Sequence, residues 1–173
     1  MTPDEYITRE LNSLKNQPKT EGELGQVIEK TILSKKFRKY AVDNDFRNHL
    51  TKIINESIAS NTPINLVWDF GGYKLWRLEE TPEVDWAELF TLIYFAKWLM
   101  PIAASFEAGV NFDFFSEDVF VPQINNVAEE DIKKYINSFR KLVELVNSYL
   151  PTNFRFSLSR LIEQYESQEL FEK

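Results

Sequence analysis

Apolar residues recur at helical spacing in three segments near the start of the chain. Residues 2–5 form a capping box, in which a Thr and a Glu side chain can each accept a hydrogen bond from the other residue's backbone. Two further apolar stripes follow over residues 24–32 and 46–58, the second after a start at residues 43–44. This part of the chain is therefore predicted to form three helices.

The pattern changes after Pro63. Residues 64–68 are almost continuously apolar, which is typical of a strand buried on both faces in a parallel sheet. Residues 110–115 and 154–157 indicate two more strands. Between the strands, apolar stripes predict a deep helix that starts near residue 85 and is ended or kinked by Pro101, and a long helix over residues 129–150. Leu158 and later apolar positions predict a last helix that runs to the terminus.

Strands that alternate with helices indicate right-handed βαβ units. The sequence therefore predicts an α/β fold with a short, mainly parallel sheet, in which residues 64–67 and 110–114 are neighbouring strands. The three N-terminal helices are expected to cap this sheet. Residues 1–173 are interpreted as a single domain, with a helical cap over residues 1–60 and an α/β core over residues 61–173.

Composition narrows the class of protein. The net charge of -7 argues against a nucleic-acid binder, because such proteins neutralise phosphates with a basic excess. The chain has no Cys and one His, His49, so it offers neither a disulfide framework nor an evident metal site. No uninterrupted apolar run reaches the ~18 residues of a membrane span, and the N-terminus does not resemble a signal peptide. We expect a soluble, cytoplasmic protein that does not bind a membrane.

A Gly-Gly loop follows the first predicted strand, and we interpret it as a candidate ligand-binding loop. Two glycines let backbone amides approach an anion closely, and Lys74 then supplies a charge or an amine. Trp76, in the same polar stretch, is a candidate for stacking on a ligand or contacting a partner. The alternative is a simple turn with a solvated lysine. The candidate residues of this loop are Phe70, Gly71, Gly72, Tyr73, Lys74 and Trp76.

Acidic residues stand at two other ends of predicted elements. Asp85 and Glu88 have the spacing of a helix cap, but their closeness to the Gly-Gly loop keeps an amine-binding or base role open. Ser116, Glu117 and Asp118 stand at the end of the second strand, where adjacent carboxylates can bind a metal or an ammonium group, or raise one another's pKa for proton transfer. They are equally consistent with a surface turn. We take Lys74, Asp85, Glu88, Glu117 and Asp118 as catalytic candidates and Ser116 as a ligand-binding one.

The segment from residue 67 to residue 135 resembles the isocyanide synthase family of pyoverdine and dityrosine biosynthesis. The resemblance lies in the Phe70 and Lys74 loop, the Asp85-x-x-Glu88 helix start, the strand that ends at residues 116–120, and Tyr135 in the next helix. It differs at the Gly-Gly pair and at Glu117-Asp118, and members of that family are considerably longer. The resemblance implies a Rossmann-like, three-layer fold and condensation of an amino-acid amine with the carbonyl of a sugar phosphate.

Two classes of function stay open at this point. In the first, the chain is a small-molecule enzyme whose acidic residues and Lys74 converge on one cleft. In the second, it is a non-catalytic accessory or protein-interaction domain with a protein partner or a second copy of itself. The sequence identifies neither the substrate nor a cofactor, and it does not fix the oligomeric state.

Overall fold

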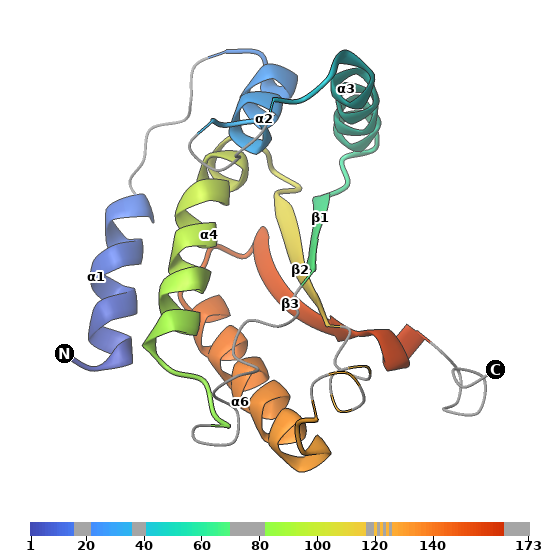
Figure 1. Ribbon diagram of the computed structural model, residues 1–173. Helices are drawn as coiled ribbons and strands as arrows, with labels where there is room; N and C mark the ends of the chain where they lie inside the picture. The colour runs from blue at the N-terminus through green and yellow to red at the C-terminus, as the bar shows by residue number, and fades with distance from the viewer. Residues whose placement is uncertain are drawn as a thin grey trace.

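The computed structural model describes residues 1–15, 22–35, 41–69, 82–116, 120, 122, 124 and 126–164. Three helices come first and are followed by alternating strands and helices (Figure 1). In chain order the elements are α1 (Pro3–Lys15), α2 (Leu24–Ile32), α3 (Asn44–Ser60), β1 (Ile64–Asp69), α4 (Trp86–Ser105), β2 (Val110–Ser116), α6 (Glu129–Asn147), β3 (Phe154–Arg160) and the short 3-10 helix η3 (Leu161–Gln164).

The three strands form one parallel sheet in the order β1-β2-β3. Ile64 is aligned with Val110, and Val110 with Phe154, so the strands start level with one another. The predicted pairing of the first two strands is confirmed. Because the strand order follows the chain order, right-handed crossovers place α4 and α6 on the same face of the sheet.

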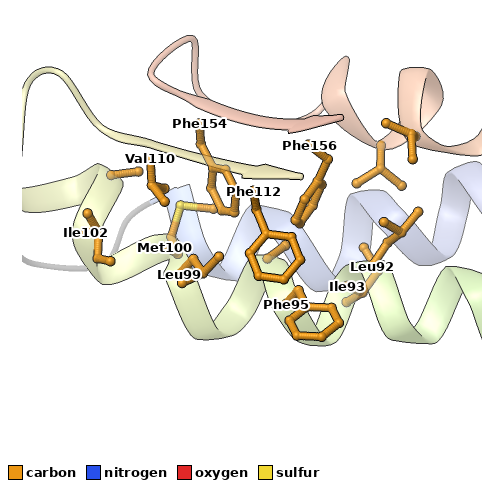
Figure 2. Close-up of a cluster of buried hydrophobic side chains, with 14 of the residues drawn as sticks. Leu92, Ile93, Phe95, Leu99, Met100, Ile102, Val110, Phe112, Phe154 and Phe156 are labelled. Carbon is orange, nitrogen blue, oxygen red and sulfur yellow. The ribbon is translucent and has the colours of Figure 1, made fainter. Parts of the chain in front are cut away.

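The core lies between this face of the sheet and the two crossover helices. Figure 2 shows Val110, Phe112 and Phe156 of the strands directed toward α4, which directs Phe95 and Leu99 back toward them. The rings of Phe95 and Phe112 are 4.7 Å apart, and on the α6 side the rings of Phe114 and Phe139 are 5.3 Å apart. Aromatic side chains of this size bury a large apolar area, so these contacts hold both helices to the central strand.

The N-terminal helices form the predicted cap. Figure 1 shows α1 on the side of α4 that faces away from the strands and α2 at the C-terminal end of α4, and both helices contact α4. The Trp98 indole N–H donates to the Thr31 carbonyl at 2.7 Å, and Lys97 forms an ion pair with Glu10. Sheet, crossover helices and cap therefore make a Rossmann-like α/β arrangement in three layers, as expected.

The other face of the sheet is polar. Asn111 donates a side-chain hydrogen bond to Asn65 at 3.0 Å, and Ser157 donates to Asp113 at 2.5 Å. On this face of β1, Val67 is 69% exposed. The interpretation of β1 as a strand buried on both faces is therefore wrong, because both crossover helices cover the same side.

Three local features differ from the expectations or go beyond them. Pro101 does not end α4, which continues to Ser105 with Ile102 and Ala103 buried; the other expectation, a kink at Pro101, stays a prediction. Leu158 belongs to β3 rather than to a final helix, and β3 runs on to Arg160. The apolar stripe of α3 is only partly covered. Ile54 is buried, whereas Phe46 and Ile53 are exposed, because α3 packs mainly on α2.

Helix α4 is long and apolar enough, by length and composition, to cross a membrane. Its most apolar stretch is 56% buried within the fold, and Glu88 and Lys97 interrupt it. A core helix of an α/β domain has this character, since it contacts the sheet on one side and the cap on the other.

Candidate functional site

The structure places three of the predicted site residues, Asp85, Glu88 and Ser116. The others lie outside the described residues, so their roles stay predictions. They are Phe70, Gly71, Gly72, Tyr73, Lys74 and Trp76 of the Gly-Gly loop, and the acidic pair Glu117 and Asp118.

Asp85 and Glu88 form a capping box at the start of α4. The Asp85 carboxylate accepts from the Ala87 N–H at 2.8 Å, and Glu88 Oε2 accepts from the Asp85 N–H at 2.7 Å. These bonds satisfy amide groups that a helix start leaves without an intrahelical partner. The capping interpretation of the pair is confirmed.

Glu88 does more than cap. Its residue is 1% exposed, and its second carboxylate oxygen, Oε1, accepts a hydrogen bond from the Tyr135 hydroxyl at 3.1 Å. Tyr135 lies in the second turn of α6 and is itself 7% exposed. Burying a carboxylate costs free energy unless the carboxylate is hydrogen-bonded. The hydrogen bond from the Tyr135 hydroxyl offsets part of this cost for Glu88. Glu88 therefore joins the starts of the two crossover helices.

A second hydrogen bond also connects α6 to the segment at the start of α4. Ser138 Oγ accepts a hydrogen bond from the Val84 N–H at 3.1 Å, just before α4 begins. Sequence reasoning did not single out Ser138, because a serine on a half-buried helix position has no distinguishing pattern. Tyr135 was indicated only by the family resemblance.

Ser116 ends the central strand and is 2% exposed. Among the described residues, Glu88 and Ser116 are the two polar or charged residues in the buried class. Ser116 lies at the carboxyl end of β2, and Glu88 lies in the first turn of α4, the helix that follows the carboxyl end of β1. Ligands of open α/β sheets bind at this end of the strands.

An aromatic groove opens beside β1. It has a volume of 570 Å³ and is lined by Trp68, Ala87, Phe90, Thr91, Tyr94, Phe95 and Trp98. The rings of Trp68 and Phe95 lie 5.3 Å apart, while Phe90 is 49% and Tyr94 is 46% exposed. Trp68, which belongs to the strand expected to be buried on both faces, is therefore partly exposed to this groove.

The described residues contain no cluster of three or more His, Asp or Glu side chains that could hold a metal ion. His49 is exposed on α3. Among the described residues, the buried polar side chains near the carboxyl end of the sheet are a carboxylate, that of Glu88, and a hydroxyl, that of Ser116.

Comparison with protein-family models, with curated proteins and with solved structures finds no match for this chain, so a function has to be argued from the residues and their geometry.

Proposed function

We propose that this protein is a small-molecule enzyme that condenses an amine with the carbonyl group of a phosphorylated substrate. Its site would lie at the carboxyl end of the parallel sheet. The observation that carries the proposal is the position of the buried polar residues Glu88 and Ser116. Burying polar groups costs free energy, and these two lie at the end of β2 and in the first turn of α4, which is the end of a sheet where α/β folds bind ligands.

The reaction is written as R–NH₂ + O=CR′₂ → R–N=CR′₂ + H₂O. The amine must first lose its ammonium proton, and the carbonyl oxygen must leave as water, so a carboxylate that moves protons is required. Glu117 and Asp118 are our candidates for that role, and Lys74 is our candidate for holding the phosphate. These three assignments rest on the sequence pattern and on the family resemblance.

Glu88 has a different part in this proposal. Its carboxylate is buried and already accepts from Asp85 and Tyr135, so it is a positioning residue rather than a group that meets substrate. By joining α4 to α6, Glu88 fixes two helix starts that flank the proposed site. The resemblance to isocyanide synthases supports the same location, since the matching residues include Glu88 and Tyr135.

A thermal-shift screen of sugar phosphates, nucleotides and amino acids tests ligand binding. A phosphorylated ligand should raise the melting temperature of the wild type. Lys74→Ala should weaken binding by roughly 1.5–3 kcal/mol, the range for a hydrogen bond to a charged group, and should leave folding nearly unchanged. Stabilisation by a phosphorylated ligand that survives removal of the lysine would disprove the anchoring role.

Borohydride trapping tests the reaction itself. With an amino acid and a ligand from the screen, reduction should convert the imine into a secondary amine that mass spectrometry detects. The control omits the protein, because free amines and carbonyls also condense slowly. If the wild type binds a phosphorylated ligand without raising the yield of trapped product, the protein is not this enzyme.

The second candidate function is a protein-interaction domain, and a specific observation favours it. The aromatic groove beside β1 exposes large apolar side chains that an isolated domain would bury more completely. A screen in which no ligand stabilises the wild type would favour this function over the enzyme.

A further inference from the structure

Strand β1 forms an outer edge of the sheet, since it pairs with β2 alone within the part of the chain that the structure describes. Its even-numbered side chains face the helix layer: Ile64 is buried, Leu66 packs against the core, and Trp68 contacts Phe95. Trp68 nevertheless remains 48% exposed, because the aromatic groove lies open beside it. An element placed next to β1 would cover this groove.

The backbone of β1 is suited to accept another strand. The Ile64 N–H donates to Gly109 at 3.0 Å, toward β2. Amide directions alternate along a strand, so the N–H and C=O groups of Asn65 and Val67 point away from β2. The described residues supply no backbone hydrogen bond to either of these outward groups.

Strand β3, at the opposite edge of the sheet, has outward backbone groups that are hydrogen-bonded by a side chain. The Asn147 side chain donates to the Phe156 carbonyl and accepts from the Phe156 N–H, both at 2.9 Å. This amide occupies the outward groups of β3 as a neighbouring strand would. Proteins commonly protect edges in such ways, or with Lys and Pro, and β1 contains neither residue.

We propose that β1 is a dimerisation edge, on which the β1 strand of a second copy of this chain pairs in antiparallel orientation. The two sheets then join into one sheet of six strands in the order β3-β2-β1-β1-β2-β3. The proposal is independent of the enzymatic function above.

Hydrogen-bond geometry determines how the two copies meet. In an antiparallel pair, a residue whose backbone groups point outward must lie opposite another such residue. In the register centred on Val67, Val67 of one copy therefore lies opposite Val67 of the other copy, and Asn65 lies opposite Asp69. Directly opposed side chains share a face of the sheet, so the helix layers of both copies lie on the same side. When Val67 opposes Val67 of the other copy, Trp68 opposes Leu66, and the two Trp68 side chains become diagonal neighbours on the helix face of the joined strands.

Charge and symmetry favour a second copy as the occupant. Asp69 is the one charged residue of β1, and in the same register each Asp69 opposes the uncharged Asn65 of the other copy rather than the other Asp69. The interface is self-complementary, as a two-fold symmetric contact requires. It covers apolar groups of both copies at once, including Trp68, Phe90 and Tyr94.

The decisive variant is Val67→Pro. Proline removes the outward N–H of Val67 but leaves the β2 ladder intact, and prolines are tolerated at the solvent side of edge strands. The matched control is Val67→Ala, which shortens the same side chain and keeps the N–H. Circular dichroism and thermal unfolding establish that both variants fold.

Light scattering after gel filtration measures the oligomeric state. The wild type and Val67→Ala should be dimers at a protein concentration of about 100 µM, where a complex with a micromolar Kd is populated. Folded Val67→Pro should bind itself at least about tenfold more weakly, because two symmetric backbone hydrogen bonds are lost. A monomeric wild type, or a folded Val67→Pro that dimerises as tightly as Val67→Ala, would overturn the proposal.

Cross-linking gives a second measurement that does not depend on the proline variant. The chain has no cysteine, so Val67→Cys introduces a single thiol. A short bismaleimide should cross-link Val67→Cys into dimers, whereas Glu130→Cys, exposed on α6, should stay monomeric under the same conditions. Equal cross-linking of the two variants would contradict pairing at β1, and would indicate that another surface is the interface.

Discussion

The Tyr135 hydroxyl donates a hydrogen bond to Glu88 Oε1 at 3.1 Å, inside the contact between α6 and α4. Both residues are buried. Their hydrogen bond joins the start of α4 to the start of α6. The link has a structural consequence that can be measured without any knowledge of the ligand.

Tyr135→Phe should lower the free energy of unfolding by about 1.5–3 kcal/mol, because it leaves Glu88 Oε1 buried without this donor. Urea denaturation measures the change. The matched control is Tyr149→Phe, which removes a tyrosine-carboxylate hydrogen bond to Asp4 at the surface. Water replaces that bond, so the control should shift the unfolding midpoint far less. Equal shifts of the unfolding midpoint in Tyr135→Phe and Tyr149→Phe would show that the burial of Glu88 does not determine how much the Tyr135 hydrogen bond stabilises the fold.

Gly109→Ala should destabilise the fold by about 2–4 kcal/mol, since strain and steric clash at a special backbone position are among the largest single-residue effects. Gly109 has φ +73°, and an added Cβ would lie 1.7 Å from the Asn153 carbonyl oxygen. Thermal unfolding measures the loss.

Gly25→Ala is the control for Gly109. Gly25 lies inside α2, and its added Cβ would be 3.4 Å from Asn55 Oδ1, close to ordinary contact. Alanine is a better helix former than glycine, so this variant should gain roughly 0.5–1 kcal/mol. A loss of stability in Gly25→Ala similar to that in Gly109→Ala would refute the explanation by local backbone geometry.

Asn147→Ala should cost about 1–3 kcal/mol, because it removes two part-buried hydrogen bonds, to the N–H and to the carbonyl of Phe156. Asn111→Ala, which removes an exposed bond to Asn65, provides the comparison. Hydrogen exchange of the Phe156 amide should also speed up in Asn147→Ala and stay slow in Asn111→Ala. Unchanged exchange in both would mean that Asn147 does not protect the β3 edge.

The ion pair between α1 and α4 should make stability depend on pH. Hydrogen bonds from Lys97, and then from Arg9, lower the pKa of the Glu10 carboxyl below its ordinary value of 4.5. A carboxyl with a lowered folded-state pKa stabilises the fold fully above its unfolded pKa, and the contribution is lost as pH falls through the folded pKa.

The stability difference between wild type and Glu10→Gln should therefore be full at pH 7. It should begin to shrink as the pH falls below about 4.5, the ordinary value of the carboxyl, and should disappear below the lowered folded-state pKa, where the Glu10 carboxyl is protonated. Urea denaturation at several pH values measures it. Glu56→Gln, whose carboxylate makes an exposed pair with Lys52, is the control and should show little difference at any pH. A Glu10→Gln difference that is the same at pH 3 and pH 7 would contradict the role of this pair.

The sequence by itself determined the elements whose causes are local. The capping boxes at Thr2 and Asp85 lie within three residues of their partners, so the starts of α1 and α4 could be read directly. The alternation of strands and helices predicted the parallel order of the sheet, because few topologies satisfy right-handed crossovers. The location of a ligand site at the carboxyl end of the strands rests on a separate rule about open α/β sheets and stays a prediction.

Tertiary structure alone decided which apolar residues are covered. Trp68 and Val67 read as buried, yet both crossover helices pack on one face and β1 is an edge strand, so these side chains are exposed. Tertiary structure also decided that Glu88, read locally as a helix cap, meets Tyr135 at a distance of 47 positions along the chain. A local pattern carries no information about which distant residue a side chain will contact, because that depends on how the helices are packed.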